Sequence, residues 1–580
     1  MSKIVTIMFR CTVHAFVDEP TFARRTKMKS IYEDVKSFWK QKTFIWPLVL
    51  TAIFSYGFLI INPTIGIDDT ASERFFQDGL EPYMGRWVLF LINKIFHFAE
   101  FAPFLTELVA VIFFCISVTL WCAVFKRVLK DELKIIGYTI FACVFISSPI
   151  LSEILTYYTH NGICMAYGIA AIAVLAFQEG IKRGKKCTCR YILLSSLFIT
   201  IAAGCYESMI FVYVTGVILV YILLCISDKK QNYCMNLLGW LVRGTVVIVL
   251  FLIFRSAIVE SLKLIFQLED KIVALPTRSI TEVEKWINGE LHAADFIMLC
   301  KRFFLKYYIN AICYLPIALF VTAIIVLLLG GGMLCVRYKE PRILLCVTAV
   351  LILPVVLLII EGETTPYRAS QYIPLICAFS ALLLFVLIET FASGKWKKMI
   401  QSMATFLLIV CVYNQCTEMN KWFYVDYLKY EDAKNVINTI AYELEKNYDV
   451  SKPVIFVGRY EIPHSIVEGA CLELNSEDFF KVRKLADKLD EHLKEKYYQN
   501  GYYCFAETPF LSVLKWGVDA FDSTNIELFN FLEMHGHSFV MEKELEKYRE
   551  AREYTGTMPV WPRDGYIRET ENYIVVKLGN

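Results

Sequence analysis

Charged residues are scarce in this chain of 580 residues. Asp, Glu, Lys and Arg together make up 20% of it, whereas 56% of the residues are hydrophobic and 15% are aromatic. The mean hydropathy of +0.48 is too high for a soluble globular protein. The net charge of +2 says little by itself, because the placement of Lys and Arg along a membrane protein matters more than their sum. We therefore expect a polytopic α-helical membrane protein with the lipid bilayer as its surroundings and no nucleic acid as a partner.

The usual motifs of metal and nucleotide sites are also missing. Nineteen cysteines are scattered along the chain, many of them inside apolar runs. The nearest cluster, Cys187-Thr-Cys189, lacks the paired C-x-x-C spacing of a zinc site. Val457-Gly458-Arg459 lacks the spaced glycines of a dinucleotide fingerprint. We predict neither a cysteine-based metal centre nor a nucleotide site.

The sequence shows few of the features that are typical of transporters. No two hydrophobic runs are interrupted at matching depths by glycine or proline, and no chain of acids runs through them. The ionisable residues within the runs are chiefly Arg243, near the inner end of its run, and Arg255, near the outer end. Arg243 is expected to extend to the inner headgroups. For Arg255, extension to the outer headgroups and binding of a lipid phosphate are both compatible with its position.

Eleven hydrophobic runs are long enough to cross a bilayer, since a helix of about 20 residues spans about 30 Å. A basic segment, residues 1–42, precedes them; it is too long for a cleaved signal peptide and is expected in the cytoplasm. A shorter run at 87–98 is interrupted by polar residues and predicts a helix lying in the outer interface. The predicted spans are 43–61, 105–125, 135–150, 163–181, 191–205, 208–226, 237–258, 309–329, 343–360, 371–391 and 399–415.

The basic residues divide unevenly between the loops. The five loops on the side of the N-terminus hold seventeen Lys or Arg, whereas the short loops on the other side hold Arg74, Arg86 and Arg368. Because positive residues accumulate on the cytoplasmic side, this division places the first outer loop, 62–104, and the long loop, 259–308, outside. The chain is thus expected to be a multi-pass membrane protein with a cytoplasmic N-terminus and an extracytoplasmic C-terminal domain.

Residues 416–580 differ in composition from the rest and predict a small α/β domain. Apolar residues recur at helical spacing within 430–450, and a buried strand is indicated at 453–458. A charged helix at 477–498 and a final strand at 573–577 complete this domain. Within the long outer loop, Ile280, Val283, Trp286 and Ile287 indicate an amphipathic helix that either shapes a groove or has no direct function.

The first outer loop combines acids and arginines in a way that a simple connection does not need. Stretch 62–86 contains adjacent aspartates, three further acids and two arginines. This pattern is typical of a site for a proton acceptor beside an anionic group, although a solvated acidic loop would also contain these residues. The residues are Asp68, Asp69, Glu73, Arg74, Asp78, Glu81 and Arg86.

The other predicted outer loops add acids, tyrosines and single arginines. Each has a simple explanation by itself, such as tyrosines at the membrane interface. Their repetition on one side, opposite plain Lys/Arg loops, predicts an outward-facing polar active site. The residues are Glu153, Tyr157, Tyr158, His160, Asn161, Tyr206, Glu207, Glu361, Tyr367 and Arg368.

The order of these features resembles the Gtr-type membrane glucosyltransferases that modify O-antigen, within the GT-C superfamily. The resemblance covers about residues 44–415, and its most specific pieces are Ile67-Asp68-Asp69 and Gly85-Arg86-Trp87. It implies a GT-C-like fold, a catalytic aspartate at the start of the first outer loop, and inversion at the anomeric carbon. It further implies a place in the inner membrane of a bacterial cell, with an undecaprenyl-phosphate-linked sugar, glucose by this likeness, as donor and a cell-surface glycan or glycolipid as acceptor.

The residues fit this chemistry independently. Asp68 or Asp69 is suited to accept the proton of the acceptor hydroxyl. Arg368, Arg255 or Arg86 is suited to bind the departing phosphate. Adjacent residues after a helix end cannot both point the same way unless the backbone turns sharply, so one carboxylate should face the cavity and the other the backbone amides of the loop. The residues expected to bind the substrates are Arg74, Tyr157, His160, Asn161, Tyr206, Glu207, Glu361 and Tyr367.

Other readings stay open at the level of sequence. Paired acids suit Mg²⁺ or Mn²⁺, so a divalent ion held by Asp68 and Asp69 is compatible with the pattern. A flippase for lipid-linked oligosaccharides should carry charges throughout the membrane depth, whereas here they concentrate at one rim. An O-antigen polymerase or ligase should have a large arginine-rich outer loop, but loop 259–308 has only Arg278 and Arg302.

Overall fold

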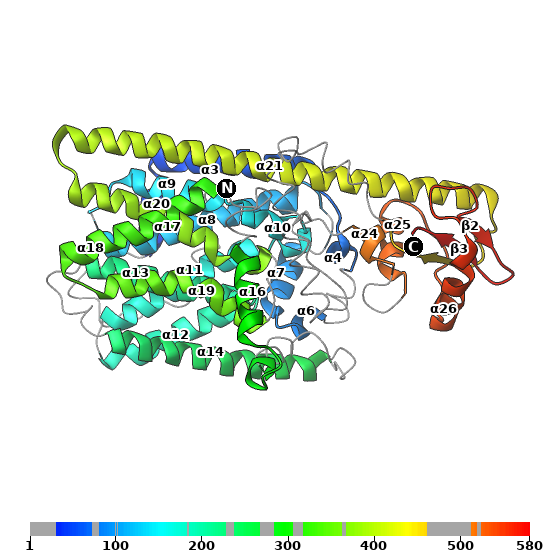
Figure 1. The fold of residues 1–580 in the computed structure, drawn as a ribbon, viewed down its shortest axis with the longest axis horizontal. Helices are drawn as coiled ribbons and strands as arrows, with labels where there is room; N and C mark the ends of the chain where they lie inside the picture. Colours follow the sequence, from blue (N-terminus) through cyan, green and yellow to red (C-terminus); the bar gives the residue numbers. More distant parts are fainter. Residues whose placement is uncertain are drawn as a thin grey trace.

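The computed structural model shows a helical bundle and a small C-terminal domain joined by one very long helix (Figure 1). It describes residues 31–71, 80–98, 100, 102–130, 132–182, 185–227, 237–266, 284–304, 317–361, 367–460, 512–518 and 524–579. Arg74, the segment Ile280–Val283, Arg278 and the predicted helix 477–498 lie outside these residues.

Eight helices in the described part of the chain are long and apolar enough to cross a membrane. Each overlaps a span predicted from the sequence. Large apolar side chains on them are exposed, as is expected of helices that face lipid; Trp46 and Phe54 are examples. The helices are α3 (Lys42–Ile61), α8 (Leu105–Leu129), α11 (Ile163–Lys182), α13 (Met209–Ser227), α14 (Leu237–Phe266), α17 with α18 (Ile317–Ile325, Gly331–Tyr338), α20 (Tyr372–Phe391) and α21 (Gly394–Asn447).

A ninth candidate span is bent. Helix α9 (Ile135–Ile146) is followed by the short turns η1 (Pro149–Leu151) and α10 (Ser152–Leu155), at an angle of 41°. Proline cannot donate an N–H and disfavours helix at the residue before it, which explains the break ahead of Pro149. The bend carries Glu153 to the neighbouring 3₁₀ turn η7 (Tyr367–Ala369).

Two further predicted spans coincide with shorter apolar helices. These are Thr188–Ala203, within α12 (Lys185–Ala203), and Arg342–Val356, within α19 (Arg342–Glu361). The prediction of eleven spans and the placement of the bilayer stay predictions. The predicted end at 329 differs from the structure, because a π-helical turn, η6 (Val326–Gly330), carries the helix past the three glycines to Tyr338.

Helix α21 runs unbroken through 54 residues, from the bundle into the C-terminal domain (Figure 1). The sequence predicted a span at 399–415 and a separate helix at 430–450. Its polar composition after 416 suggested a boundary, but no proline or glycine lies between Gly394 and Asn447 to interrupt the backbone hydrogen bonds. At 1.5 Å per residue the helix is about 80 Å long.

The C-terminal domain is built around a three-stranded sheet in the order β1-β3-β2. β1 (Val454–Val457) pairs in parallel with β3 (Ile574–Lys577), and β2 (Ile567–Glu569) pairs antiparallel with β3. Both predicted strands are present, whereas β2 was missed because it has only three residues and two of them are charged. Helices α24 (Val513–Trp516), α25 (Ile526–Met534) and α26 (Leu545–Tyr554) complete the described part of the domain.

Smaller helices lie at the end of the bundle near this domain. A helix is present where one was expected at 87–98, as α7 (Trp87–Phe96), preceded by α6 (Leu80–Tyr83), and its place in the membrane interface stays a prediction. Helix α4 (Ile67–Thr70) follows α3 and lies between the bundle and the C-terminal domain (Figure 1). α2 (Ile31–Trp39) lies within the basic N-terminal segment, and α16 (Ala293–Phe304) lies within the long loop.

Candidate functional site

Helix α4 places two adjacent carboxylates at the end of the bundle. It is a single turn, and its side chains leave the axis about 100° apart from one residue to the next. Asp68 and Asp69 therefore diverge, as the sequence leads one to expect. The backbone of Gly66 at the start of this turn lies against the ring of Tyr157, where an added Cβ would come within 2.5 Å of Tyr157 Cε1. Glycine is thus required for this close approach.

Asp69 holds the turn of α4 in place through hydrogen bonds. Its side chain is fully buried, and Oδ2 accepts a hydrogen bond from the Gly66 amide at 2.9 Å. Oδ1 accepts hydrogen bonds from the amide of Thr159, at 3.4 Å, and from its hydroxyl, at 3.2 Å. Burial raises the pKa of Asp69, and the Gly66 amide and the Thr159 donors act against that rise. These contacts give Asp69 a structural role that ties α4 to the loop at 157–161.

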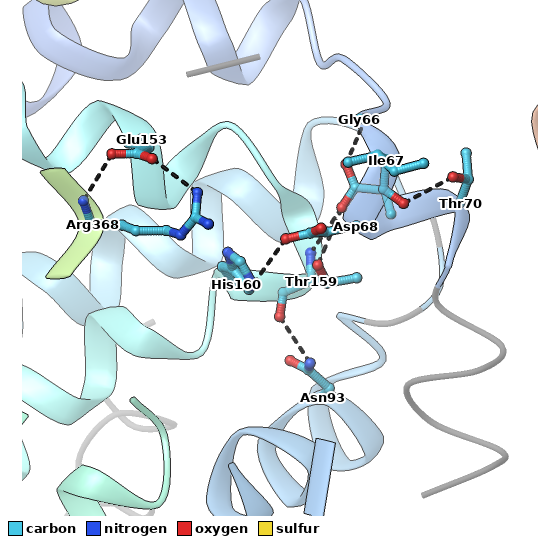
Figure 2. A network of polar contacts seen from close by, with 10 residues as sticks. Gly66, Ile67, Asp68, Thr70, Asn93, Glu153, Thr159, His160 and Arg368 are labelled. Atoms are coloured by element: carbon cyan, nitrogen blue, oxygen red, sulfur yellow. Dashed lines mark hydrogen bonds and ion pairs between the residues drawn. The ribbon is translucent and has the colours of Figure 1, made fainter. Parts of the chain in front are cut away.

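The loop at 157–161 is itself fixed. Asn93, on α7, donates through Nδ2 to the carbonyl of Thr159 at 2.9 Å, and the hydroxyl of Tyr158 donates to the carbonyl of Asp69 at 3.3 Å. Figure 2 shows this chain of contacts running from Gly66 through Thr159 to Asn93. Asp68 is consequently carried on a turn that the bundle holds at several points.

Asp68 is the more available of the two carboxylates. Its side chain is 20% exposed, and Oδ2 lies 3.8 Å from His160 Nε2, which is beyond hydrogen-bonding distance. Burial raises the pKa of Asp68, and the positive charges of Arg368 and Arg86 oppose that rise. A carboxylate with a raised pKa is a better proton acceptor than one in water.

Arg368 is held beside Asp68 by Glu153. Its amide donates to Glu153 Oε2 at 2.8 Å, and its Nη1 donates to Glu153 Oε1 at 2.9 Å. Figure 2 shows the guanidinium on the side that faces His160 and Asp68. Arginine recognises phosphate and carboxylate through parallel N–H groups. Glu153 was noted in the sequence only as one acid among several, because its partner lies 215 residues away.

Gly85-Arg86-Trp87 forms the turn into α7. Gly85 has φ +84°, a conformation that favours glycine, and an added Cβ there would lie 3.4 Å from Glu207 Oε1. Arg86 lies over the ring of Tyr206 with its Cζ 4.9 Å from the ring centroid, a cation–π arrangement. The motif thus brings the guanidinium of Arg86 to the same end of the bundle as Asp68.

Arg255 and Glu207 form an ion pair with each other. Both are partly exposed, and the pair lies against Gly85. Of the three arginines expected to bind phosphate, Arg368 and Arg86 act on the charge of Asp68, whereas Arg255 lies against Gly85, the residue before Arg86.

Several expected residues are buried nearby or fall outside the described atoms. Asn161 is 1% exposed, and neither its Oδ1 nor its Nδ2 has a partner among the described residues. Arg74 lies outside the described residues, as do the side chains of Glu361 and Tyr367. No group of three His, Cys, Asp or Glu suited to a metal occurs in the part of the chain that the structure describes. Asp69 accepts three hydrogen bonds, and a divalent ion shared by Asp68 and Asp69 stays a prediction.

Glu81 is a further carboxyl that the sequence did not single out. Its side chain is 2% exposed, and its Oε2 has no partner among the described residues. Burial raises the pKa of Glu81 to about 8; the charge of Arg86 opposes the rise and that of Asp68 adds to it. A buried carboxyl can be recognised only once the fold is known, because in sequence Glu81 is one acid of an acidic loop.

A family model, described as glucosyl transferase GtrII, matches residues 57–385. The chain belongs to this family. The protein is accordingly a glycosyltransferase, as the resemblance predicted, and the match contains Asp68, Arg86, Glu153, His160 and Arg368. It ends within α20, so α21 and the C-terminal domain lie beyond it. No curated protein matches the chain.

The burial of Glu81 in this GtrII transferase makes stability depend on pH. Below its ordinary pKa of 4.5 Glu81 is protonated in both the folded and the unfolded chain. Between 4.5 and about 8 the unfolded chain releases the proton and the folded chain keeps it, so stability falls as pH rises through this window. A pKa raised this far corresponds to a loss on the order of several kcal/mol.

We expect the wild-type protein to melt at a lower temperature near pH 8 than near pH 5, and Glu81→Gln to reduce that difference by several degrees. Thermal unfolding of both proteins in detergent measures the effect. Glu571→Gln, at an exposed position of the C-terminal domain, is the matched control and should behave like the wild type. Equal pH dependence of Glu81→Gln and the wild type would contradict the assignment.

Proposed function

We propose that this protein transfers a sugar, glucose by family likeness, from a polyprenyl-phosphate carrier to a cell-surface glycan or lipid-linked acceptor with inversion, on the outer face of the bacterial cytoplasmic membrane. The observation that carries the proposal is the environment of Asp68: a partly exposed carboxylate on a fastened turn, near His160, with the charges of Arg368 and Arg86 acting on it.

The proposed transfer of the sugar is a single displacement at its anomeric carbon. The acceptor hydroxyl oxygen attacks the anomeric carbon while the bond from that carbon to the phosphate oxygen breaks, and the departing polyprenyl phosphate takes the bonding electrons. Asp68 accepts the proton of the hydroxyl. The new bond forms on the face opposite the leaving group, so the configuration inverts and no enzyme nucleophile is needed.

Two arginines are suited to the leaving group. Arg368 and Arg86 present positive charge near Asp68, and charge placed where the phosphate develops its negative charge lowers the barrier. Glu153 holds Arg368 through both its amide and its guanidinium, so the arginine pays little ordering entropy when the donor binds. Asp69 keeps the turn in place and takes no part in proton transfer.

The outer face is supported by the distribution of basic residues, seventeen on the side of the N-terminus against three among the short loops on the other side. A non-catalytic flippase does not fit membership of a transferase family. Polymerase or ligase activity would use the same kind of lipid-linked substrate, and product analysis distinguishes it because whole glycan chains would then be moved.

The test is a transfer assay with the purified full-length protein in proteoliposomes. Radiolabelled undecaprenyl-phosphate-glucose is supplied with lipid-linked glycan acceptors, and the label and the anomeric configuration of the product are followed. We expect transfer of a single inverted sugar from the lipid donor and none from a nucleotide-sugar. Transfer from the nucleotide-sugar alone, or retention of configuration, would overturn the proposal. An epitope after Lys577 should be reached by antibody in spheroplasts if the C-terminal domain is outside.

A further inference from the structure

The C-terminal domain touches the turn that carries Asp68. Asn530, on α25, donates through Nδ2 to the carbonyl of Thr70, the last residue of α4, at 2.8 Å. Helices α24 and α25 both pack against α4, and Figure 1 shows α4 lying between the bundle and these two helices. The contact joins residues 460 positions apart in the sequence.

Ile65 makes a second contact, on the other side of the turn. Its side chain is 2% exposed and belongs to the hydrophobic core of the C-terminal domain, and not to that of the bundle. In that core it joins residues of α21, β1 and α25, including Ile437, Val454 and Leu528. The segment that carries Asp68 is therefore bracketed by the C-terminal domain, at Ile65 before the turn and at Thr70 after it.

A turn this short needs such support. Four helical residues do not hold their conformation in isolation, because the nucleation of a helix is unfavourable. From the bundle, the turn is held through Asp69 and Thr159. From the C-terminal domain, it is held through Ile65 and Asn530. The C-terminal contacts come from a region outside the stretch that the family model matches.

We propose that the C-terminal domain positions Asp68 for catalysis. Asn530 and the apolar site that receives Ile65 hold the turn in addition to the contacts that the bundle makes through Thr159. Asn530 is a positioning residue and touches no substrate. This inference rests on the proposed role of Asp68. Displacement of a reacting group by about 1 Å can cost about 100-fold in rate, so loss of one of several supports should cost less.

The central variant is Asn530→Asp, which keeps the size of the side chain and replaces the N–H donor by an oxygen facing the Thr70 carbonyl. We expect kcat to fall about tenfold, with the KM for undecaprenyl-phosphate-glucose changed less than about twofold, because the phosphate-binding arginines are untouched. Asn530→Gln, which retains the amide donor on a longer side chain, should recover part of kcat. Hydrogen exchange of the amides at 66–71 should be faster in Asn530→Asp than in the wild type.

The matched control is Asn438→Ala. Asn438, on α21, also uses its side-chain amide within the C-terminal domain, where Oδ1 lies 3.1 Å from His537 Nε2, and this contact does not involve α4. It should leave kcat and the exchange at 66–71 unchanged. Ile65→Val, a smaller change at the other contact, serves if Asn530→Asp does not fold, and it should also lower kcat and speed exchange.

Two failures can be told apart by including Asp68→Asn in the same series. If Asp68→Asn is inactive while Asn530→Asp and Ile65→Val keep wild-type kcat and exchange, the positioning role is wrong and the proposed function stands. If Asp68→Asn keeps its activity, the proposed function is wrong. A fall in kcat for Asn530→Asp that Asn438→Ala reproduces would show general destabilisation of the domain and overturn the inference.

Discussion

Asp68→Asn should lower the rate of sugar transfer by about 10²–10⁴-fold, the usual cost of losing a general base. The amide keeps the shape of the side chain but cannot accept the proton of the acceptor hydroxyl. Asp69→Asn should behave differently. One oxygen of Asp69 accepts from the Gly66 amide and the other from Thr159, and an amide nitrogen at either place would face a donor. We expect impaired folding and a smaller loss of rate in the protein that folds.

The measurement is single-turnover transfer with protein that has been shown to insert and to elute as a single species. Thermal unfolding of the same samples separates the two aspartates, since Asp68→Asn should melt near the wild-type temperature and Asp69→Asn below it. If both variants transfer sugar at near-normal rates, the acidic loop is only a solvated surface and the mechanism must be abandoned or moved to another carboxylate.

Arg368→Ala should reduce transfer by about 10²–10³-fold, comparable to removing one donor that stabilises developing negative charge. Arg368→Lys should lie between this variant and the wild type, because it keeps the charge and loses the planar fork that fits a phosphate. Arg368→Ala also removes the guanidinium from Glu153, which is 7% exposed and keeps the hydrogen bond from the amide at 368, so part of the loss will appear as lower stability.

Donor affinity distinguishes phosphate binding from stability. Binding of undecaprenyl phosphate should weaken in Arg368→Ala at a temperature where the protein remains folded. Arg127→Ala is the matched control, since Arg127 pairs with Asp34 on α2 and is not among the charges that act on Asp68. Donor binding that is indifferent to both Ala and Lys at position 368 would place the phosphate elsewhere.

The helices of the bundle could be predicted because the residues that determine each helix are close together in the sequence. Long apolar runs ended by basic residues or by Asn62-Pro63 predict where α3 and its neighbours begin and end. The continuity of α21 could have been predicted in the same way. The change in composition after 416 reflects a change of surroundings along one helix, and no residue between Gly394 and Asn447 interrupts the backbone.

The site was predictable in part. That Asp68 and Asp69 point in different directions follows from the helical repeat, but which of them is tied down depends on Thr159, which lies 90 residues away. The pairing of Arg368 with Glu153 spans 215 residues and follows from the bend at Pro149. Such partners are fixed by how the helices pack, and no local pattern in a single sequence encodes that packing.

Because α21 is unbroken, its length fixes how the C-terminal domain is rotated relative to the bundle. Each residue added to or removed from a rigid helix turns everything beyond it by about 100° and shifts it by about 1.5 Å. A single-residue change between Cys416, which hydrogen-bonds with Ser55 of α3, and Ala433, in the C-terminal core, would swing α25 away from Thr70. Seven residues would nearly restore its direction but leave the domain about 10 Å too far along the axis. The length of α21 therefore sets both the distance between the bundle and the C-terminal domain and their relative rotation. Few helix lengths give the values of both that bring α25 to Thr70.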